Sequence, residues 1–232
     1  MCGRYALFTL SPELIETVLG WLPLDEHGLL LPRWNIAPTQ QAPVFRTNAE
    51  GRRALDPLRW GLVPSWAPDL KFGAKTINAR AETAAGKPAF RSAFRARRCL
   101  VPVTGFYEWR KDSKPKQPYF IRSAASPVLL FAGLWESWTD KTTGEIVESF
   151  TILTTEAAGD VAKIHDRMPV VLTPERWSAW LDPALRDAVA AEKLLHGPAT
   201  ELHLVPIGFG VNNARNEGPD LVTPLPEDAP PA

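Results

Sequence analysis

Short runs of strand-forming residues, separated by short turns, recur along the chain and constrain its fold more than any other feature. Charged segments at Lys111–Lys116 and Asp140–Glu145 predict two hairpin turns, the second with Gly144 at its flexible position. Helical patterns occur irregularly between the runs, so a regular βαβ alternation is absent. The sequence therefore predicts an α+β fold with a largely antiparallel, barrel-like β-sheet and peripheral helices. The predicted strands are Ala42–Arg46, Leu58–Val63, Leu100–Val103, Phe106–Arg110, Pro118–Arg122, Val128–Trp135, Phe150–Thr154, Pro169–Leu172 and Leu202–Pro206.

One helix is predicted with both of its ends defined. Ser11 is the N-cap, Pro12 takes the first helical position and Gly20 ends the helix. The sequence contains no obvious linker or internal repeat, so residues 2–225 are predicted to form a single domain. The acidic, Pro-rich tail at 226–232 is predicted to be disordered. Further helices are predicted over Pro88–Arg97, from Thr155 to just before His165, from Thr173 to Leu181, and over Ala184–Leu195.

Charge and cysteine content narrow the possible classes of protein. The 232 residues carry 26 basic and 26 acidic side chains, so a nucleic-acid partner would require a local basic face. Cys2 and Cys99 cannot build a disulfide framework, no Cys/His spacing fits zinc, and neither a metal nor a cofactor is expected. The sequence shows no signal-peptide pattern and no apolar run of about 18 residues, which predicts a cytoplasmic protein without a membrane partner. A monomer is expected, because no extended apolar face is left over for a partner.

Cys2 follows the initiator methionine directly. A small second residue allows Met1 to be removed, which would leave Cys2 with a free α-amine and a thiol on adjacent carbons. Their reference pKa values, about 7.7–8.0 and about 8.5, give each group a reactive fraction near neutral pH. Such an aminothiol can act as a nucleophile, or can capture an aldehyde as an imine that closes to a thiazolidine. The alternative is an incidental residue at a frayed terminus, and position alone leaves both readings open.

Two ionisable residues are candidates for proton transfer. Glu108 alternates with Tyr107 and Trp109 on a predicted strand, and a carboxyl group among aromatic rings is desolvated, which raises its pKa. The alternative is a surface glutamate with its stem lying on the sheet. His165 stands in a loop that closes a predicted helix, which suits a proton shuttle. It could equally be stabilised there by the helix dipole without any catalytic role.

If the segment Ile77–Glu82 is extended, Asn78, Arg80 and Glu82 share one face. This face is either a solvated surface or one wall of a site for an anionic substrate. Further along the chain, Arg167 either binds phosphate or pairs with its neighbour Asp166.

Other polar and aromatic residues give weaker signals. Arg91, Arg95 and Arg98 are spaced to form a basic stripe on a helix, which suits phosphate contact but is more often only solvated. Trp66 follows a proline in a loop, where an exposed position and a core position are equally expected. Asn35, taken alone, is most simply the cap of a turn.

Six motifs occur in a fixed order and together are much more specific than any of them alone. On these motifs the chain closely resembles the SOS response-associated peptidase (SRAP) family, from Cys2 to about Leu225. The motifs are Cys2-Gly3-Arg4-Tyr5, Trp34-Asn35-Ile36-Ala37-Pro38, Trp60-Gly61 with Pro64 and Trp66, Ile77-Asn78-Ala79-Arg80, Gly105-Phe106-Tyr107-Glu108-Trp109, and Ile164-His165-Asp166-Arg167-Met168-Pro169.

The resemblance implies a sensor of abasic sites in single-stranded DNA, which forms a covalent thiazolidine crosslink through Cys2 and so shields the lesion. It further implies that Asn78 hydrogen-bonds the adduct, Glu108 acts in acid–base steps, and His165 assists sugar-ring opening and crosslink reversal. Self-removal of Met1 and lyase-like chemistry at the abasic site are also implied. The residues implied to contact DNA are Gly3, Arg4, Asn35, Trp66, Arg80, Thr154, Arg167 and Asn213.

Two other functions remain open from the sequence. An N-terminal-cysteine hydrolase of the glutamine amidotransferase type also begins with a processed Met-Cys-Gly, and glutaminase activity would identify it. A noncovalent single-stranded DNA-binding module would keep its binding after Cys2→Ala and would leave no denaturant-resistant product.

Overall fold

A closed ring of five strands forms the centre of the computed structural model, which describes residues 2–21, 28–112, 114–197 and 200–226. Strand β10 pairs with β4, β4 with β3, β3 with β6, β6 with β9, and β9 again with β10. Only the β10–β4 pairing in this ring is parallel, so the predicted barrel-like and largely antiparallel sheet is confirmed. The ring consists of β3 (Gln41–Thr47), β4 (Arg53–Trp60), β6 (Arg98–Val103), β9 (Leu129–Thr139) and β10 (Ile146–Glu156).

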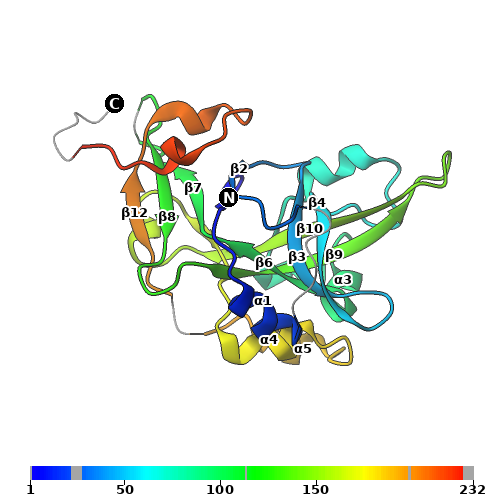
Figure 1. The fold of residues 1–232 in the computed structure, drawn as a ribbon. Helices are drawn as coiled ribbons and strands as arrows, with labels where there is room; N and C mark the ends of the chain where they lie inside the picture. The colour runs from blue at the N-terminus through cyan, green and yellow to red at the C-terminus, as the bar shows by residue number, and fades with distance from the viewer. Residues whose placement is uncertain (1, 22–27, 113, 198–199, 227–232) are drawn as a thin grey trace.

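A second, antiparallel sheet lies beside the barrel in the order β12–β8–β7–β1–β2, with its β12, β8 and β7 strands at the left of Figure 1. Two short strands extend the barrel sheet at β10: β5 runs parallel to it and β11 antiparallel. These seven strands are β1 (Tyr5–Leu7), β2 (Arg33–Ile36), β5 (Asn78–Arg80), β7 (Gly105–Trp109), β8 (Pro118–Arg122), β11 (Arg167–Pro169) and β12 (His203–Pro206).

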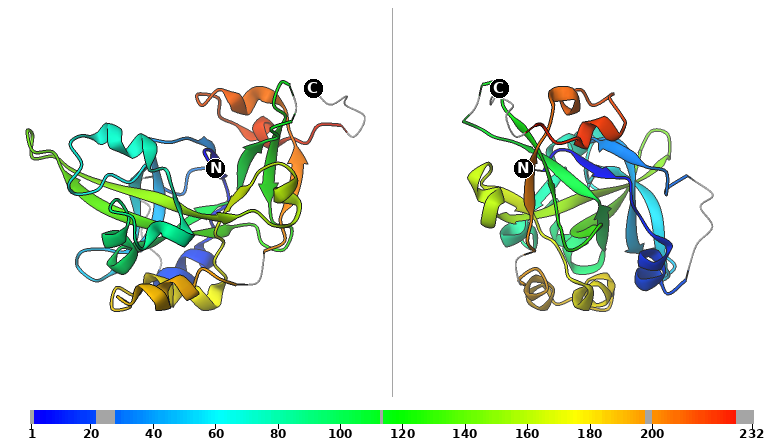
Figure 2. Two further views of the ribbon diagram at one scale, coloured as in Figure 1. Left: turned by 180° about the vertical axis from the view of Figure 1, so that it is seen from behind. Right: turned by 60° about the vertical axis from the view of Figure 1, so that its left-hand side comes forward.

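Helices lie at the periphery, as predicted, and α1, α4 and α5 gather at one end of the barrel (Figures 1 and 2). The first helix has the predicted ends, because Ser11 caps it by accepting from the Leu14 N–H and Gly20 takes a left-handed φ of 83°. No helix in the described ranges is both long and apolar enough to cross a membrane. The helical elements are α1 (Pro12–Leu19), η1 (Leu70–Lys75), α2 (Ala81–Ala84), α3 (Arg91–Ala96), η2 (Gly159–Lys163), α4 (Pro174–Leu181), α5 (Ala188–Lys193), η3 (Phe209–Asn212) and η4 (Pro219–Val222).

The helix predicted between Thr155 and His165 is wrong for most of its length. Strand β10 continues to Glu156, where the backbone pairs with Arg167 of β11, and only the short 3-10 helix η2 follows. Gly159 has a positive φ of 58°, so an α-helix cannot run through this position from Thr155. The backbone pairing with β11 therefore overrides the helical pattern in the sequence and brings the His165 loop next to β10.

The predicted strand Leu58–Val63 ends early, at Trp60. Gly61 has a φ of 117°, and a Cβ atom built there would lie 2.6 Å from the Gly73 carbonyl oxygen. The chain therefore turns where two backbone segments approach closely. Three other predicted elements are shorter or displaced, with β11 at Arg167–Pro169, α3 at Arg91–Ala96 and α5 at Ala188–Lys193.

The predicted basic stripe does not form. Arg91 and Arg95 are exposed on α3, but Arg98 belongs to β6 and is 3 % exposed. Its guanidinium donates to the carbonyl oxygens of Phe94, Trp180 and Asp182. Burial lowers the pKa of Arg98 to about 10, so the side chain stays charged at neutral pH. Arg98 therefore joins the ends of α3 and α4 to the barrel.

Replacing Arg98 by leucine should destabilise the fold without creating a large cavity. The change leaves three buried or partly buried carbonyl groups without their donor, and the expected loss is about 2–4 kcal/mol. For a chain of this size, that corresponds to a fall in Tm of roughly 5–15 °C. Thermal unfolding measures the Tm of Arg98→Leu, with Arg95→Ala as the control. Arg95→Ala should change Tm by no more than about 2 °C. Equal melting of the two variants would contradict the role assigned to Arg98.

Candidate active site

Cys2 is buried immediately before β1, in the same apolar cluster as Phe106 of β7. The Asn78 amide Nδ2 donates to the Cys2 carbonyl oxygen at 2.7 Å, and the Cys2 thiol contacts the Arg4 carbonyl oxygen at 3.8 Å. The possibility of a frayed terminus is therefore wrong for Cys2. The Asn78–Cys2 hydrogen bond also joins β5, in the barrel sheet, to the start of β1 in the second sheet.

The charge of Glu108 acts on the Cys2 thiol. Burial raises the pKa of the Cys2 thiol far above its ordinary value, and the negative charge of Glu108 raises it further. Glu108 lies on β7 and is 4 % exposed, and burial raises the pKa of its carboxyl group as well. The predicted direction of the Glu108 pKa shift is therefore confirmed. Both groups are held toward their neutral, protonated forms, so the thiol needs a base at the moment it reacts.

Asn78 presents an acceptor as well as a donor. Its strand, β5, pairs with β10 through the register Asn78 opposite Ile152. Its side-chain Oδ1 is buried and accepts no hydrogen bond from the part of the chain that the structure describes. A buried amide oxygen without a donor costs free energy, about 1–3 kcal/mol, unless a ligand or water supplies one. Asn78 is therefore suited to hold a donor group next to Cys2.

His165 follows η2, and its side chain is only 11 % exposed. Burial lowers the pKa of its imidazole, and the positive charge of Lys111 contributes in the same direction. Its Nδ1 lies 2.9 Å from the Arg167 backbone nitrogen, so the neutral ring can accept that N–H with its own proton on Nε2. Only the short 3-10 helix η2 precedes His165 in place of the predicted helix, and the lowered pKa does not indicate a stabilised cation.

Arg167 and Arg4, which are both expected to contact DNA, are engaged within the protein. Arg167 forms a bidentate ion pair with Glu82, at 2.9 and 2.8 Å, and also donates to the Thr154 carbonyl oxygen at 2.6 Å. It pairs with Glu82 rather than with Asp166. Because Glu82 lies on α2, beyond the end of β5, it does not continue the face of Asn78 and Arg80 as an extended segment would. Arg80 is exposed.

Arg4 is held by the C-terminal part of the chain. Its Nη1 donates to Asn35 Oδ1 at 2.7 Å and to the Val211 carbonyl oxygen at 2.8 Å. Asn35 is fully buried on β2, and its Nδ2 donates to the carbonyl oxygens of Asn213 and Asn216 at 3.0 and 2.9 Å. Asn35 therefore does not cap a turn. It connects the first strands to residues 211–216, a function that the sequence motif did not reveal.

Trp66 is exposed, which is one of the two positions that the sequence left open for it. Its side chain is 52 % exposed and packs edge-on against Phe72, with ring centroids 5.1 Å apart. The loop beneath it is fixed, because the Trp138 indole donates to the Ala67 carbonyl oxygen at 2.9 Å and Val63 N–H donates to Ser149 Oγ at 2.8 Å. An exposed ring on a fixed loop can stack on a nucleobase.

The predicted site residues other than Arg80, which is exposed on β5, thus fall into three groups. Cys2, Asn78 and Glu108 come together, and His165 lies on the loop before β11, beside the Arg167–Thr154 contact. Arg4, Asn35 and Asn213 form a second group, with Gly3 partly buried beside it in the sequence. Trp66 stands on its own loop. Among the described residues, no cluster of three or more His, Cys, Asp or Glu side chains is placed to hold a metal ion.

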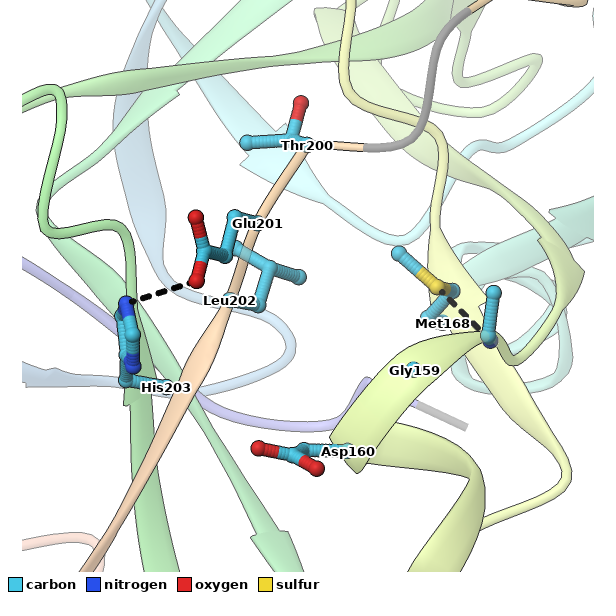
Figure 3. A pocket seen from close by; sticks show the side chains of 8 residues that line it. Gly159, Asp160, Met168, Thr200, Glu201, Leu202 and His203 are labelled. Carbon is cyan, nitrogen blue, oxygen red and sulfur yellow. Dashed lines mark hydrogen bonds and ion pairs between the residues drawn. The ribbon is translucent and has the colours of Figure 1, made fainter.

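A separate pocket of about 290 Å³ opens between η2 and the segment that leads into β12 (Figure 3). Its ionisable groups contact each other or their own helix: Glu201 lies 3.8 Å from His203, and Asp160 pairs with Lys163 at 2.6 Å. The described residues that line it include none of the predicted site residues. The pocket is therefore distinct from the candidate site around Cys2.

Comparisons with known proteins show which family the chain belongs to. Residues 1–214 match the model of the family described as SOS response associated peptidase (SRAP). The abasic site processing protein YoqW of Bacillus subtilis is 38 % identical over 226 residues, covering 96 % of this chain and 99 % of its own. HMCES of Xenopus tropicalis, with the same descriptive name, is 32 % identical over 97 % of this chain and 78 % of its own. A crystal structure of a Bacteroides thetaiotaomicron protein superposes with a TM-score of 0.82 at 26 % identity, covering 97 % of this chain and all of that one.

The buried carboxyl group of Glu108 should reduce stability as the pH rises. Its pKa is raised in the folded state, so the folded protein binds this proton more tightly than the unfolded chain does. The resulting stabilisation is complete below the unfolded pKa of about 4.3 and is lost as the pH rises through the folded value. Glu108→Gln, which stays neutral, should therefore become more stable than the unsubstituted protein as the pH increases.

Thermal unfolding of both proteins at pH 4.5 and pH 8 measures this difference. At pH 8 the Tm of Glu108→Gln should be higher by roughly 2–8 °C, which corresponds to about 1–2 kcal/mol. At pH 4.5 the two values should lie much closer together. A difference in Tm that does not change with pH would contradict the raised pKa.

Proposed function

Because the chain belongs to the SOS response-associated peptidase family, we propose that it captures abasic sites in single-stranded DNA through a covalent bond to Cys2. The observation that carries the proposal is the burial of Cys2 between Asn78, which binds its carbonyl oxygen, and Glu108, whose charge acts on its thiol. The relatives YoqW and HMCES are named abasic site processing proteins, which supports the same substrate.

The proposed reaction starts from Cys2 as the N-terminal residue, after Met1 has been removed. The neutral α-amine attacks the aldehyde carbon of the ring-opened deoxyribose and gives a carbinolamine. Glu108, protonated because of its raised pKa, gives its proton to the departing hydroxyl group. Water leaves, an iminium ion forms and Glu108 becomes a carboxylate.

The Glu108 carboxylate then takes the proton of the Cys2 thiol while the sulfur attacks the iminium carbon. A C–S bond forms, the C=N electron pair returns to nitrogen, and the thiazolidine ring closes with Glu108 protonated again. One water molecule is released overall, and no oxidant or reductant is consumed. A neutral thiol beside a regenerating base fits this order, in which the amine reacts first.

The neighbouring residues have supporting roles in this proposal. Asn78 Oδ1 accepts a hydrogen bond from the adduct. His165, neutral with its proton on Nε2, donates toward the sugar ring oxygen during ring opening and reversal. Without closure by sulfur, the imine favours elimination of the 3′ phosphate, which is lyase-like strand cleavage. We assign the peptidase activity in the family name to one cleavage only, the removal of Met1.

The DNA strand is held, in this proposal, by exposed groups around Cys2. Arg80 supplies a phosphate contact, and Trp66 stacks on a base near the lesion. Arg167 contacts a phosphate only by sharing its guanidinium with Glu82 or by releasing Glu82. Arg4 contributes charge while it remains bound to Asn35 and Val211, and Gly3, Thr154 and Asn213 shape the surface.

Covalent capture is tested with single-stranded DNA that carries one abasic site, on a denaturing gel, with removal of Met1 verified by mass. The Met1-free protein should give a shifted, denaturant-resistant band. Cys2→Ala keeps an α-amine, so it should give such a band only when borohydride reduces its imine, and it should cleave the strand otherwise. Glu108→Gln should form the crosslink about 10²–10⁴ times more slowly.

A tetrahydrofuran analogue of the abasic site, which has no aldehyde, should bind without any covalent band. A resistant band with Cys2→Ala and no reductant would contradict the role of the thiol. Absence of a band with Met1-free protein, together with glutaminase activity, would favour the amidotransferase-type alternative. Equal noncovalent binding by both proteins and no band with either would favour the simple binding module.

Removing the negative charge of Glu82 should strengthen noncovalent binding of single-stranded DNA. In Glu82→Gln the Arg167 guanidinium loses its carboxylate partner and a charge that repels phosphate disappears. Affinity for the tetrahydrofuran oligonucleotide should rise roughly 3–10-fold, the size expected of one partly exposed ion pair. Fluorescence anisotropy measures this, with Glu145→Gln on the distant β9–β10 hairpin as the matched control for net charge. Weaker binding by Glu82→Gln would show that the ion pair positions Arg167 for DNA.

A further inference from the structure

The β7–β8 connection reaches the His165 loop through one ion pair. Lys111 Nζ lies 2.7 Å from Asp166 Oδ1, and the same carboxylate oxygen lies 3.1 Å from His165 Nδ1. Three charged or ionisable groups therefore stand in a row, Lys111–Asp166–His165. The row links the hairpin that follows Glu108 on β7 to the loop that precedes β11.

A carboxylate next to a histidine ordinarily stabilises the imidazolium form and orients the ring through Nδ1–H. Here Nδ1 accepts the Arg167 backbone N–H at 2.9 Å, an arrangement that requires Nδ1 to carry no proton. The Arg167 carbonyl oxygen, at 3.2 Å, and Asp166 Oδ1 are the acceptors that a protonated Nδ1 would use. The ring can therefore take either state, and the charges around it select between them.

The charges that act on His165 come from its own loop and from the segments facing it. Burial, the positive charge of the N-terminal amine and that of Lys111 disfavour the protonated ring, whereas Asp166 favours it. The hydrogen bond from Lys111 holds the pKa of Asp166 at about 2, so its carboxylate stays ionised and paired throughout the physiological range. The Lys111 ammonium therefore offsets the field of Asp166 at the imidazole.

We infer that Lys111 masks the Asp166 carboxylate and is thereby a positioning residue that keeps His165 neutral, with its proton on Nε2. Its use in the reaction rests on the function proposed above, in which His165 Nε2–H donates to the sugar ring oxygen. The masking itself is a property of the free protein. It can therefore be tested without DNA, independently of covalent capture.

The test is a pH titration of His165 in the full, Met1-free protein by two-bond ¹H–¹⁵N spectra, which also report the tautomer. The spectrum of His165→Gln identifies the signal among the four histidines. Lys111→Met should raise the titration midpoint of His165 by roughly 0.3–0.7 pH units, the size of one exposed ion pair. Lys116→Met, which removes a charge from the same hairpin, should move it by less than about 0.1 unit. Asp166→Asn should lower the midpoint.

The double variant Lys111→Met/Asp166→Asn separates an effect of Lys111 through Asp166 from direct repulsion between Lys111 and the His165 imidazolium. If Lys111 acts through Asp166, Lys111→Met should shift His165 by less than half as much when residue 166 is asparagine. An unchanged or lowered midpoint in Lys111→Met, or an equal shift in both backgrounds, would overturn the inference. So would a proton found on Nδ1 in the neutral ring.

Crosslinking rates of the same variants, measured against pH, then test the connection to the reaction. The limb of the pH profile that reports His165 should move in the direction and by the amount seen in the titration. If the titration midpoint of His165 moves but the pH profile of the crosslinking rate does not, the masking by Lys111 stands and His165 has no part in the proposed reaction. Loss of crosslinking by all proteins with normal titrations would instead count against the proposed function alone.

Discussion

The shared burial of Cys2 and Glu108 is the constraint on which the candidate site depends. Water would ionise the carboxyl group at neutral pH and leave part of the thiol as thiolate. Burial in the protein instead favours the protonated form of each group, and the charge of Glu108 further opposes ionisation of the Cys2 thiol. Burial of Glu108 costs stability at neutral pH and favours a protonated carboxyl group close to Cys2, which is the proton that the proposed reaction uses. Such a cost is typical of functional sites.

Strand β10 sets the geometry around this buried pair. It closes the barrel through β4 and β9, and it also pairs with β5 and β11, so one strand positions several candidate residues at once. Ile152 stands opposite Asn78, Thr154 stands opposite both Arg80 and Pro169, and Glu156 stands opposite Arg167. A shift of β10 by one residue would turn these side chains to opposite faces. The long strand β10 therefore fixes the register of β5 and β11. With three residues each, these two strands could not fix their register alone.

The sequence predicts those parts of the fold that depend on local signals. The Asp140–Glu145 turn and the first helix follow from their own turn and capping residues, and both form as expected. The short strands β1, β2 and β5 have too few residues to show an alternating pattern, and their partners are distant in sequence. Arg98 could not be recognised as buried, because its three acceptors come from α3 and the end of α4. Asn35 likewise depends on carbonyl groups 178 and 181 residues away in the sequence.

In the proposed function, the placement of positive charge limits how DNA can be held. With equal numbers of acidic and basic residues, the chain has no bulk attraction for a polyanion, and binding must come from local groups. Arg4 and Arg167 are engaged by Asn35, Val211 and Glu82, so a phosphate must share or displace those partners. When an arginine exchanges a protein partner for a phosphate, the net gain in binding free energy is small. In the proposed reaction, retention of the lesion therefore depends more on the bond to Cys2 than on phosphate contacts, and undamaged single strands, which offer no aldehyde, would be released.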